Sequence, residues 1–295
     1  MVWTTDGTEG LIAQLDQLRF RNVSIMGSGV VTLAPSLQKV AALDETAVWQ
    51  IGEDHSHKPY LATGSRARVF ALGKREPVFD GGTGEVLCIA TDPQGNLWFG
   101  VSPEGKVYRF RPGGAIMPVT ELGTTYVFSL LPSSDGGVVS GTGPEGKFFR
   151  ISPSGNVRLI WTAPQSNITA LAWLVPGREV LAGTSPEGLV YRLTFSPSGD
   201  VVRRETFFDT GQEEVKGLVA GRTLVFIAAN PSVTGSDTAG PMVLAVDRTG
   251  VLRWQWRCPD SVAFSLMEHE GRLLVGTGNR GVVYALDTLG SVSVL

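Results

Sequence analysis

Residues 136–152 read GGVVSGTGPEGKFFRIS, and close copies of this stretch recur along the chain at nearly constant spacing. In this stretch a short apolar run ends in Gly, a turn containing Pro and Gly follows, and a second run is rich in aromatic and β-branched residues. Both runs are too short for a helix, which needs about 10–12 residues, so the stretch predicts a β-hairpin. Copies lie at 97–110, 180–193 and 273–286, with a degenerate one at 61–72.

A further short strand is expected before each hairpin. The corresponding runs are AVWQI (47–51), EVLCI (85–89), YVFSL (126–130), NITAL (167–171), EVKGL (214–218) and VAFSL (262–266). Their central residues follow one another at intervals of about 38 to 48 residues, which is the length of a β-propeller blade. A turn such as SPSG (152–155) and a fourth strand such as NVRLIW (156–161) come after the hairpin. The sequence therefore predicts an all-β propeller of four-stranded antiparallel blades.

This pattern also resembles a known group of proteins. A strand like YVFSL, the motif VxxGTGPEGxVYRI and an SPSG turn are similar to bacterial β-propeller proteins of the WD-repeat-like, NHL-like and two-component-regulator-propeller group. The resemblance covers residues 45–295 and assigns no subfamily. It implies an architecture without an activity, because propellers include lyases, lactonases, quinone enzymes and pure binding scaffolds.

The number of blades and the closure of the ring leave alternatives. We expect an N-terminal extension at 1–17 and one propeller domain at 18–295, with repeats at about 45–84, 85–125, 126–166, 167–213, 214–260 and 261–295. Residues 18–36 predict a closing hairpin, in which 30–34 (VVTLA) supplies a strand to the last blade. The segment 291–295 (SVSVL) competes for that place. Six blades are favoured, with seven as the alternative.

Composition excludes several classes of partner. The net charge is −3 and no lysine- or arginine-rich block is present, so the sequence lacks the footprint of a nucleic-acid or anionic-membrane binder. No apolar stretch approaches the 18 or so residues of a membrane span. Residues 1–20 contain no secretory signal pattern. The chain is cytoplasmic if Met1 is the native start and extracytoplasmic if a signal has been removed. We expect both cysteines, Cys88 and Cys258, to be buried and unpaired.

The hairpin turns form the first candidate site. In propeller order these turns share one rim of the ring with the connections between blades, and recognition usually lies on such loops. The rim carries the charged residues Glu104, Glu145, Glu187, Arg66, Arg68 and Arg280. An insertion at 230–241 (NPSVTGSDTAGP) lies in the same location. The leading hypothesis is a non-enzymatic scaffold that binds a protein partner or joins a larger complex through this rim.

The mouth of the central channel forms the second candidate site. The starts of the inner strands offer a partly acidic ring, made of Glu45, Glu85, Asn167, Glu214 and Asp260, with solvated strand ends as the favoured interpretation. Lactonase-like and lyase-like propellers need carboxylates, or histidine with glutamate, along the channel. The alternative functions are therefore a channel-centred metal-dependent hydrolase, lactonase or lyase, and a ligand-sensing module that binds a small ligand in the channel.

Other chemical motifs have structural explanations. GTGPEG (141–146) leads into a strand, whereas a dinucleotide fingerprint must lead into a helix. The cluster of Glu53, Asp54, His55 and His57 is interpreted as a solvated turn. Arg109, Arg150 and Arg192 recur at one position of the hairpin, which indicates packing between blades. No catalytic residue, metal site or cofactor is predicted.

Overall fold

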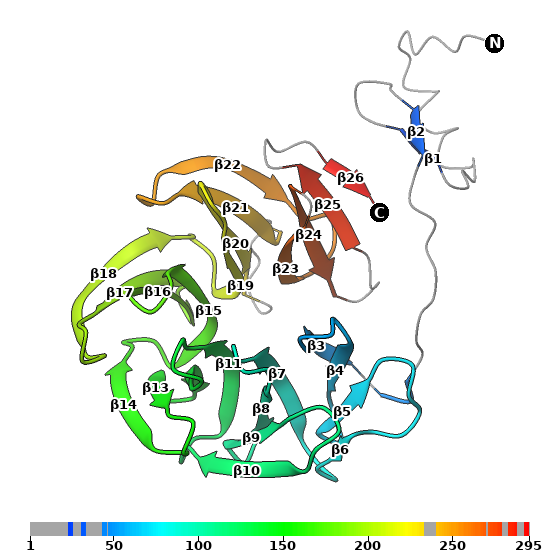
Figure 1. Ribbon diagram of the computed structural model, residues 1–295. Coiled ribbons are helices and arrows are strands. Elements are labelled where there is room, and N and C mark those ends of the chain that lie inside the picture. Colours follow the sequence, from blue (N-terminus) through cyan, green and yellow to red (C-terminus); the bar gives the residue numbers. More distant parts are fainter. Residues whose placement is uncertain are drawn as a thin grey trace, which may run out of the picture.

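The computed structural model describes residues 23–25, 31–33, 43–45, 47–232, 240–269, 271–278, 283–287 and 292–294. Every regular element in these ranges is a strand, and none of them contains a helix that could cross a membrane. Six four-stranded antiparallel sheets stand around a common centre, and Figure 1 shows them as the blades of a propeller. The predicted fold, with six blades rather than seven, is confirmed.

Each blade is one sequence repeat, and its strands follow in order from the centre outward (Figure 1). Blade 1 holds β3 (Val48–Glu53), β4 (Pro59–Thr63), β5 (Arg68–Ala71) and β6 (Phe79–Asp80). Blade 2 holds β7 (Glu85–Thr91), β8 (Leu97–Ser102), β9 (Lys106–Phe110) and β10 (Ile116–Glu121). Blade 3 holds β11 (Tyr126–Pro132), β12 (Val138–Gly143), β13 (Lys147–Ile151) and β14 (Val157–Thr162).

The second half of the ring repeats this order. Blade 4 holds β15 (Asn167–Val175), β16 (Glu179–Ser185), β17 (Leu189–Phe195) and β18 (Val201–Asp209). Blade 5 holds β19 (Glu214–Ala220), β20 (Leu224–Asn230), β21 (Met242–Asp247) and β22 (Leu252–Arg257). Blade 6 holds β23 (Ala263–His269), β24 (Arg272–Thr277), β25 (Val283–Asp287) and β26 (Val292–Val294).

The hairpin turns adopt the conformation that their glycines predict. Gly146, in the turn from β12 to β13, has φ +56°, and Gly188 in the next blade has φ +52°. A side chain at Gly146 would also overlap the carbonyl oxygen of Gln165, in the connection to blade 4. Glycine is therefore needed here both for the backbone conformation and for the close approach of the next connection.

All six inner strands carry the same irregularity. The register of each inner strand with its neighbour shifts by one residue, so that one residue has no partner across the ladder. These extra residues are Trp49, Leu87, Phe128, Thr169, Lys216 and Phe264. A bulge of this kind re-aims a side chain and commonly lies next to functional sites. The fold therefore repeats one bulge six times around its axis.

The glycine of the second strand explains how neighbouring blades pack. The branched side chain that precedes the bulge of one blade lies where a side chain of this glycine would be. Val127 Cγ1 is 2.5 Å from an ideal Cβ on Gly100, and Ile168 Cγ2 is 2.6 Å from one on Gly141. The glycine of the repeated motif GxxPEG thus opens a socket for the next blade, and buried apolar clusters surround these contacts.

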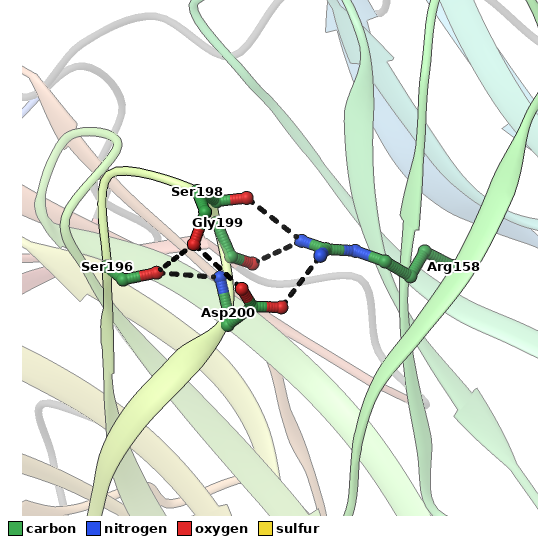
Figure 2. Close-up of polar contacts among 5 residues, drawn as sticks. All are labelled: Arg158, Ser196, Ser198, Gly199 and Asp200. Carbon is green, nitrogen blue, oxygen red and sulfur yellow. Dashed lines mark hydrogen bonds and ion pairs between the residues drawn. The ribbon is translucent and has the colours of Figure 1, made fainter.

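Arginines tie neighbouring blades together at the outer turns. Figure 2 shows Arg158 of β14 donating to the Asp200 carboxylate at 2.7 Å and to the Gly199 carbonyl at 2.6 Å, both in the β17–β18 turn of blade 4. Arg109 makes a similar contact across the preceding seam, donating to the Pro153 carbonyl at 2.8 Å. Arg150 and Arg192 donate to Asp135 and Glu179 of their own blades. The expected contact between blades is therefore seen for Arg109, whereas the ion pairs of Arg150 and Arg192 lie within their own blades.

Closure of the ring differs from the expectation. The hairpin of β1 (Val23–Ile25) and β2 (Val31–Leu33) pairs only within itself among the described strands, and Figure 1 shows it apart from the blades. The outer place of blade 6 belongs to β26, from the competing C-terminal segment. The prediction that residues 30–34 supply a strand to the last blade is therefore wrong, because blade 6 obtains its fourth strand from its own repeat.

Candidate functional site

The six bulged residues meet in one cavity at the centre of the ring. We call Trp49, Leu87, Phe128, Thr169, Lys216 and Phe264 the channel waist. Together with residues that follow on the inner strands, they line a partly open space of about 180 Å³. Aromatic and aliphatic side chains, including Leu130 and Leu266 beside the waist, share its walls with polar groups in about equal measure. A concave space with convergent polar groups is the general form of a small-molecule site.

One ammonium group lies in this lining. Lys216 projects from β19, and its Nζ is 3.1 Å from Oε1 of Glu214, two residues earlier on the same strand. The same Nζ lies 5.9 Å from the centre of the Phe264 ring, within the range of a cation–π contact. Both charged side chains are about three quarters buried, with 26% and 28% of their surfaces exposed. Lys216 therefore brings one ammonium group to the waist, and its partner Glu214 does not itself line the cavity.

Two aromatic contacts hold the walls of the waist. Trp49 of blade 1 meets Phe264 of blade 6 edge to face, with ring centres 6.0 Å apart. Phe128 of blade 3 stacks on Tyr126, with ring centres 5.3 Å apart. The indole Nε1 of Trp49 is buried and has no hydrogen-bond partner. A buried donor without an acceptor is uncommon in native structures and calls for an explanation.

Residues predicted at the channel mouth divide into two sets. Glu85, Asn167 and Glu214 begin β7, β15 and β19, each two residues before a residue of the waist. Glu45 instead pairs with Arg68 at 3.3 Å, and its side chain is almost fully buried. Asp260 is also buried, accepting hydrogen bonds from Thr277 and Tyr284 inside blade 6. None of these five residues is among those that line the central cavity.

The charged residues predicted on the rim are engaged locally. Glu104 pairs with Lys106 at 2.6 Å and raises the pKa of that lysine, and Glu145 pairs with Lys147. Glu187 accepts a hydrogen bond from Gln165 at 2.7 Å. Arg68 binds Asp80 as well as Glu45, and Arg66 lies on the exposed turn between β4 and β5. Arg280 lies outside the described residues. The acidic turns are thus partly neutralised by their own neighbours.

The donor set does not suit a metal ion. No group of three or more His, Cys, Asp or Glu side chains that could hold a metal occurs in the part of the chain that the structure describes. In the β3–β4 turn, Asp54 accepts hydrogen bonds from the Ser56 hydroxyl and from backbone amides, which lower its pKa. His57 meets only Glu53, at 3.1 Å on the exposed surface. Glu53, His55 and His57 are exposed, as expected for a solvated turn, whereas Asp54 is buried and bound by donors of the turn itself. This cluster does not fit the metal-dependent form of the enzyme hypothesis.

Sequence reasoning locates the waist residues without recognising them as a site. They are the central residues of the six inner strands, and their regular spacing reveals the repeat. A bulge, however, depends on the pairing of two strands and leaves no mark in a single strand's composition. A signal does exist in retrospect, since Lys216 is the one charged residue at a repeated position that is otherwise apolar or, at Thr169, uncharged.

Comparisons with known proteins agree with this fold. The family described as two component regulator propeller matches residues 80–102. No curated protein matches the chain in sequence. Virginiamycin B lyase from Staphylococcus aureus is similar in structure with a TM-score of 0.66 and 13% identity, over 85% of this chain and 84% of the lyase. In a second structure of that lyase, a histidine-to-alanine variant is catalytically inactive and is seen with quinupristin.

Two other solved structures share the architecture. A protein named as a gluconolactonase is similar with a TM-score of 0.59 and 15% identity, over 87% of this chain and 92% of that chain. A chain of the nidogen–laminin complex gives a TM-score of 0.59 and 11% identity, over 80% of this chain and 88% of that chain. At these levels of identity the likeness establishes a common fold.

These findings correct the leading functional hypothesis. The expectation of a non-enzymatic scaffold is wrong on this comparison, because the solved structures that share this fold include a lyase and a protein named as a gluconolactonase. The arrangement of side chains agrees with this correction. Glu104 and Glu145 on the rim are paired with neighbouring lysines, whereas the central cavity is lined by side chains from all six blades. The family match and the shared fold together identify the chain as a β-propeller repeat protein of the bacterial group, without assigning its subfamily.

Proposed function

We propose that this propeller is an enzyme that acts on a small organic molecule in its central channel, by elimination or by hydrolysis of an ester or lactone. The observation that carries the proposal is the ammonium group of Lys216 in the lining of the waist cavity, paired with Glu214 two residues earlier on the same strand. An ammonium group at a largely buried position stabilises negative charge that develops on an enolate or oxyanion. The neighbouring carboxylate accepts a proton from carbon or from water and returns it to the leaving group.

The similar structures support this reaction class. One of them is a lyase and another is named as a gluconolactonase. No histidine is among the described residues that line the waist cavity, where Lys216 is the basic residue. We therefore propose chemistry in which the chain's own Lys216 and Glu214 bind the reacting group and move its proton.

The experiment is an activity screen with matched variants. The purified protein is incubated with small lactones, aryl esters and β-substituted carbonyl compounds, and products are followed by mass spectrometry. We expect turnover of at least one class, and a loss of about 10²- to 10³-fold in kcat/KM for Lys216→Met and Glu214→Gln. Lys106→Met, which removes a paired lysine of the rim, should retain activity. Equal activity in Lys216→Met, or turnover of no class, contradicts the proposal.

The family match favours a second candidate function. Residues 80–102, which include all of β7 and β8, match the two component regulator propellers, and this favours a ligand-sensing module. The same channel would then bind its ligand without converting it. Calorimetry that detects stoichiometric binding, together with unchanged ligand after prolonged incubation, would favour the sensor over the enzyme.

A further inference from the structure

The waist combines three properties that restrict its ligand. Its volume is about 180 Å³, close to the roughly 150 Å³ of an apolar protein cavity that holds one benzene molecule. Phe128 of blade 3 and Phe264 of blade 6 supply aromatic walls on opposite sides of the propeller axis. Leu87 of blade 2 supplies an aliphatic wall. A cavity of this size and shape suits one planar six-membered ring with a short substituent. Polymers and oligosaccharides are too large for it.

The charge of the lining selects the substituent. Lys216 is the only charged residue in the lining of the described cavity, while its partner Glu214 lies toward the channel mouth. A lysine ammonium has three N–H donors, and the contact with Glu214 uses one of them. The remaining donors favour an anion. Because Glu214 stays close, a single negative charge is accommodated better than the double charge of a phosphate monoester.

An unsatisfied donor belongs to a second residue of the lining. The indole Nε1 of Trp49 is buried without a partner, which costs free energy. Trp49 and Lys216 come from blades 1 and 5, and both contact the ring of Phe264 in the intervening blade 6. Both residues therefore border the same aromatic ring. A carboxylate, with two acceptor oxygens, can accept from the indole N–H with one oxygen and from the ammonium with the other.

We propose that the channel waist recognises a small aromatic monocarboxylate, whose ring lies among Phe128, Leu87 and Phe264 and whose carboxylate binds Lys216 and Trp49. The inference rests on the proposed function in one respect, namely that the waist is the substrate site. It adds the chemical class of the substrate or product. It also assigns to Trp49 a role in ligand specificity through its indole N–H.

The test compares benzoate with its neutral isostere benzamide. Binding of each probe to the full chain is measured by calorimetry and by the shift in unfolding temperature. We expect benzoate to bind at least tenfold more tightly than benzamide. Lys216→Met should abolish this preference, and Trp49→Phe, which keeps an aromatic ring and removes the N–H, should weaken benzoate binding about tenfold. Lys106→Met should leave both affinities unchanged. Unfolding temperatures without ligand verify that the variants fold.

The outcomes separate this inference from the proposed enzymatic activity. Benzamide binding as tightly as benzoate, or a preference that survives Lys216→Met, overturns the inference. Benzoate binding with the expected variant pattern supports it even if no substrate is converted, in which case the enzymatic proposal fails alone. If a lactone or ester is converted while benzoate neither binds the protein nor inhibits the reaction, the enzymatic proposal is supported and the proposed recognition of an aromatic carboxylate is overturned.

Discussion

Five of the six seams between blades are closed by a buried apolar cluster, whereas the described residues form no such cluster between blades 6 and 1. Each cluster joins two consecutive blades, from blades 1 and 2 to blades 5 and 6. At the sixth seam, the contact given by the described residues is that of Trp49 with Phe264. Figure 1 shows β3 and β23 separated more widely than the other inner strands.

The same sequence positions behave differently at the two kinds of seam. The residue before the bulge is fully buried in blades 2 to 6, where it is Val86, Val127, Ile168, Val215 and Ala263. In blade 1 it is Val48, which is 46% exposed. At the closed seam between blades 4 and 5, Val215 fills the socket at Gly183, whereas the three atoms nearest an added Cβ on Gly276 of blade 6 all belong to Ser265 of the same blade.

The difference shows that the sequence repeat gives neighbouring blades matching faces, while the short connections between consecutive blades bring those faces into contact. Consecutive blades are joined by short connections, so their side chains meet at little further entropic cost. Blades 6 and 1 are joined only through the entire ring, and their contact carries the cost of closing a long loop. Val48 and Gly276 are thus a pair equivalent to those that meet at the three seams from blade 2 to blade 5, where the second strand carries the same glycine. The following predictions compare these two kinds of seam.

Thiol labelling should give the largest difference. Burial raises the pKa of Cys88 to about 12, and its thiol donates to the Val127 carbonyl across the seam between blades 2 and 3. At pH 8 the thiolate fraction of Cys88 is therefore on the order of 10⁻⁴, while an exposed thiol introduced by Val48→Cys has an ordinary pKa near 8.5. We expect the introduced thiol to react with a maleimide or disulfide reagent at least about a thousandfold faster, as located by peptide mass spectrometry.

The pH dependence of this labelling follows from the sign of the shift. Because the folded pKa of Cys88 lies above the ordinary value, its reactivity should keep rising with pH long after the Val48→Cys thiol has reached its plateau above about pH 9. Comparable rates for the two thiols at pH 8 would mean that the seam between blades 2 and 3 opens as readily as the sixth.

Truncating the branched residue before the bulge should give the next largest effect. Val215→Ala removes two methyl groups from a fully buried socket, and we expect a loss of about 2 kcal/mol in the free energy of unfolding. Val48→Ala makes the same chemical change at an exposed site and should cost less than about 0.5 kcal/mol. Urea unfolding of both variants measures the difference. Equal losses would show that Val48 occupies a socket at Gly276 in solution.

Filling the socket should give a smaller difference. The backbone of Gly183 and Gly276 lies outside the left-handed region, so alanine is conformationally allowed at both positions. At Gly183 the new methyl group would lie 2.8 Å from Cβ of Val215, and we expect overpacking to cost about 1–2 kcal/mol. At Gly276 the Ser265 hydroxyl can rotate away, and the expected cost is below about 0.5 kcal/mol. Thermal unfolding of the pair is sufficient. A larger loss for Gly276→Ala than for Gly183→Ala would reverse this interpretation.

The closed seams and the sixth seam also show how much the sequence can reveal. The repeat, the strand order and the turn glycines follow from local patterns, because Gly146 and its equivalents carry their conformational requirement in their own position. The composition of residues 18–36 predicts strands, but composition does not determine which strands they pair with. The outer place of blade 6 is taken by β26, which is much nearer to β25 along the chain. The waist was hidden for a related reason, since a bulge is a property of two paired strands. Asp260 likewise has the composition of a channel carboxylate, but the hydroxyls of Thr277 and Tyr284 hold it inside its blade.

The outer arginine contact should have the smallest effect on a closed seam. Arg158 donates to the Asp200 carboxylate and to the Gly199 carbonyl of the neighbouring blade, but its side chain is largely accessible to solvent (Figure 2). Exposed ion pairs contribute about 0–1 kcal/mol, so Arg158→Met should lower the free energy of unfolding by less than about 1 kcal/mol. The control Arg203→Met removes an arginine paired with Glu205 within blade 4 and should change stability still less. Salt of about 1 M should shrink the Arg158 effect, because screening weakens the attraction to Asp200. A loss that exceeds that of Val215→Ala, or one that salt leaves unchanged, would mean that the arginine, rather than the buried socket, holds the blades together.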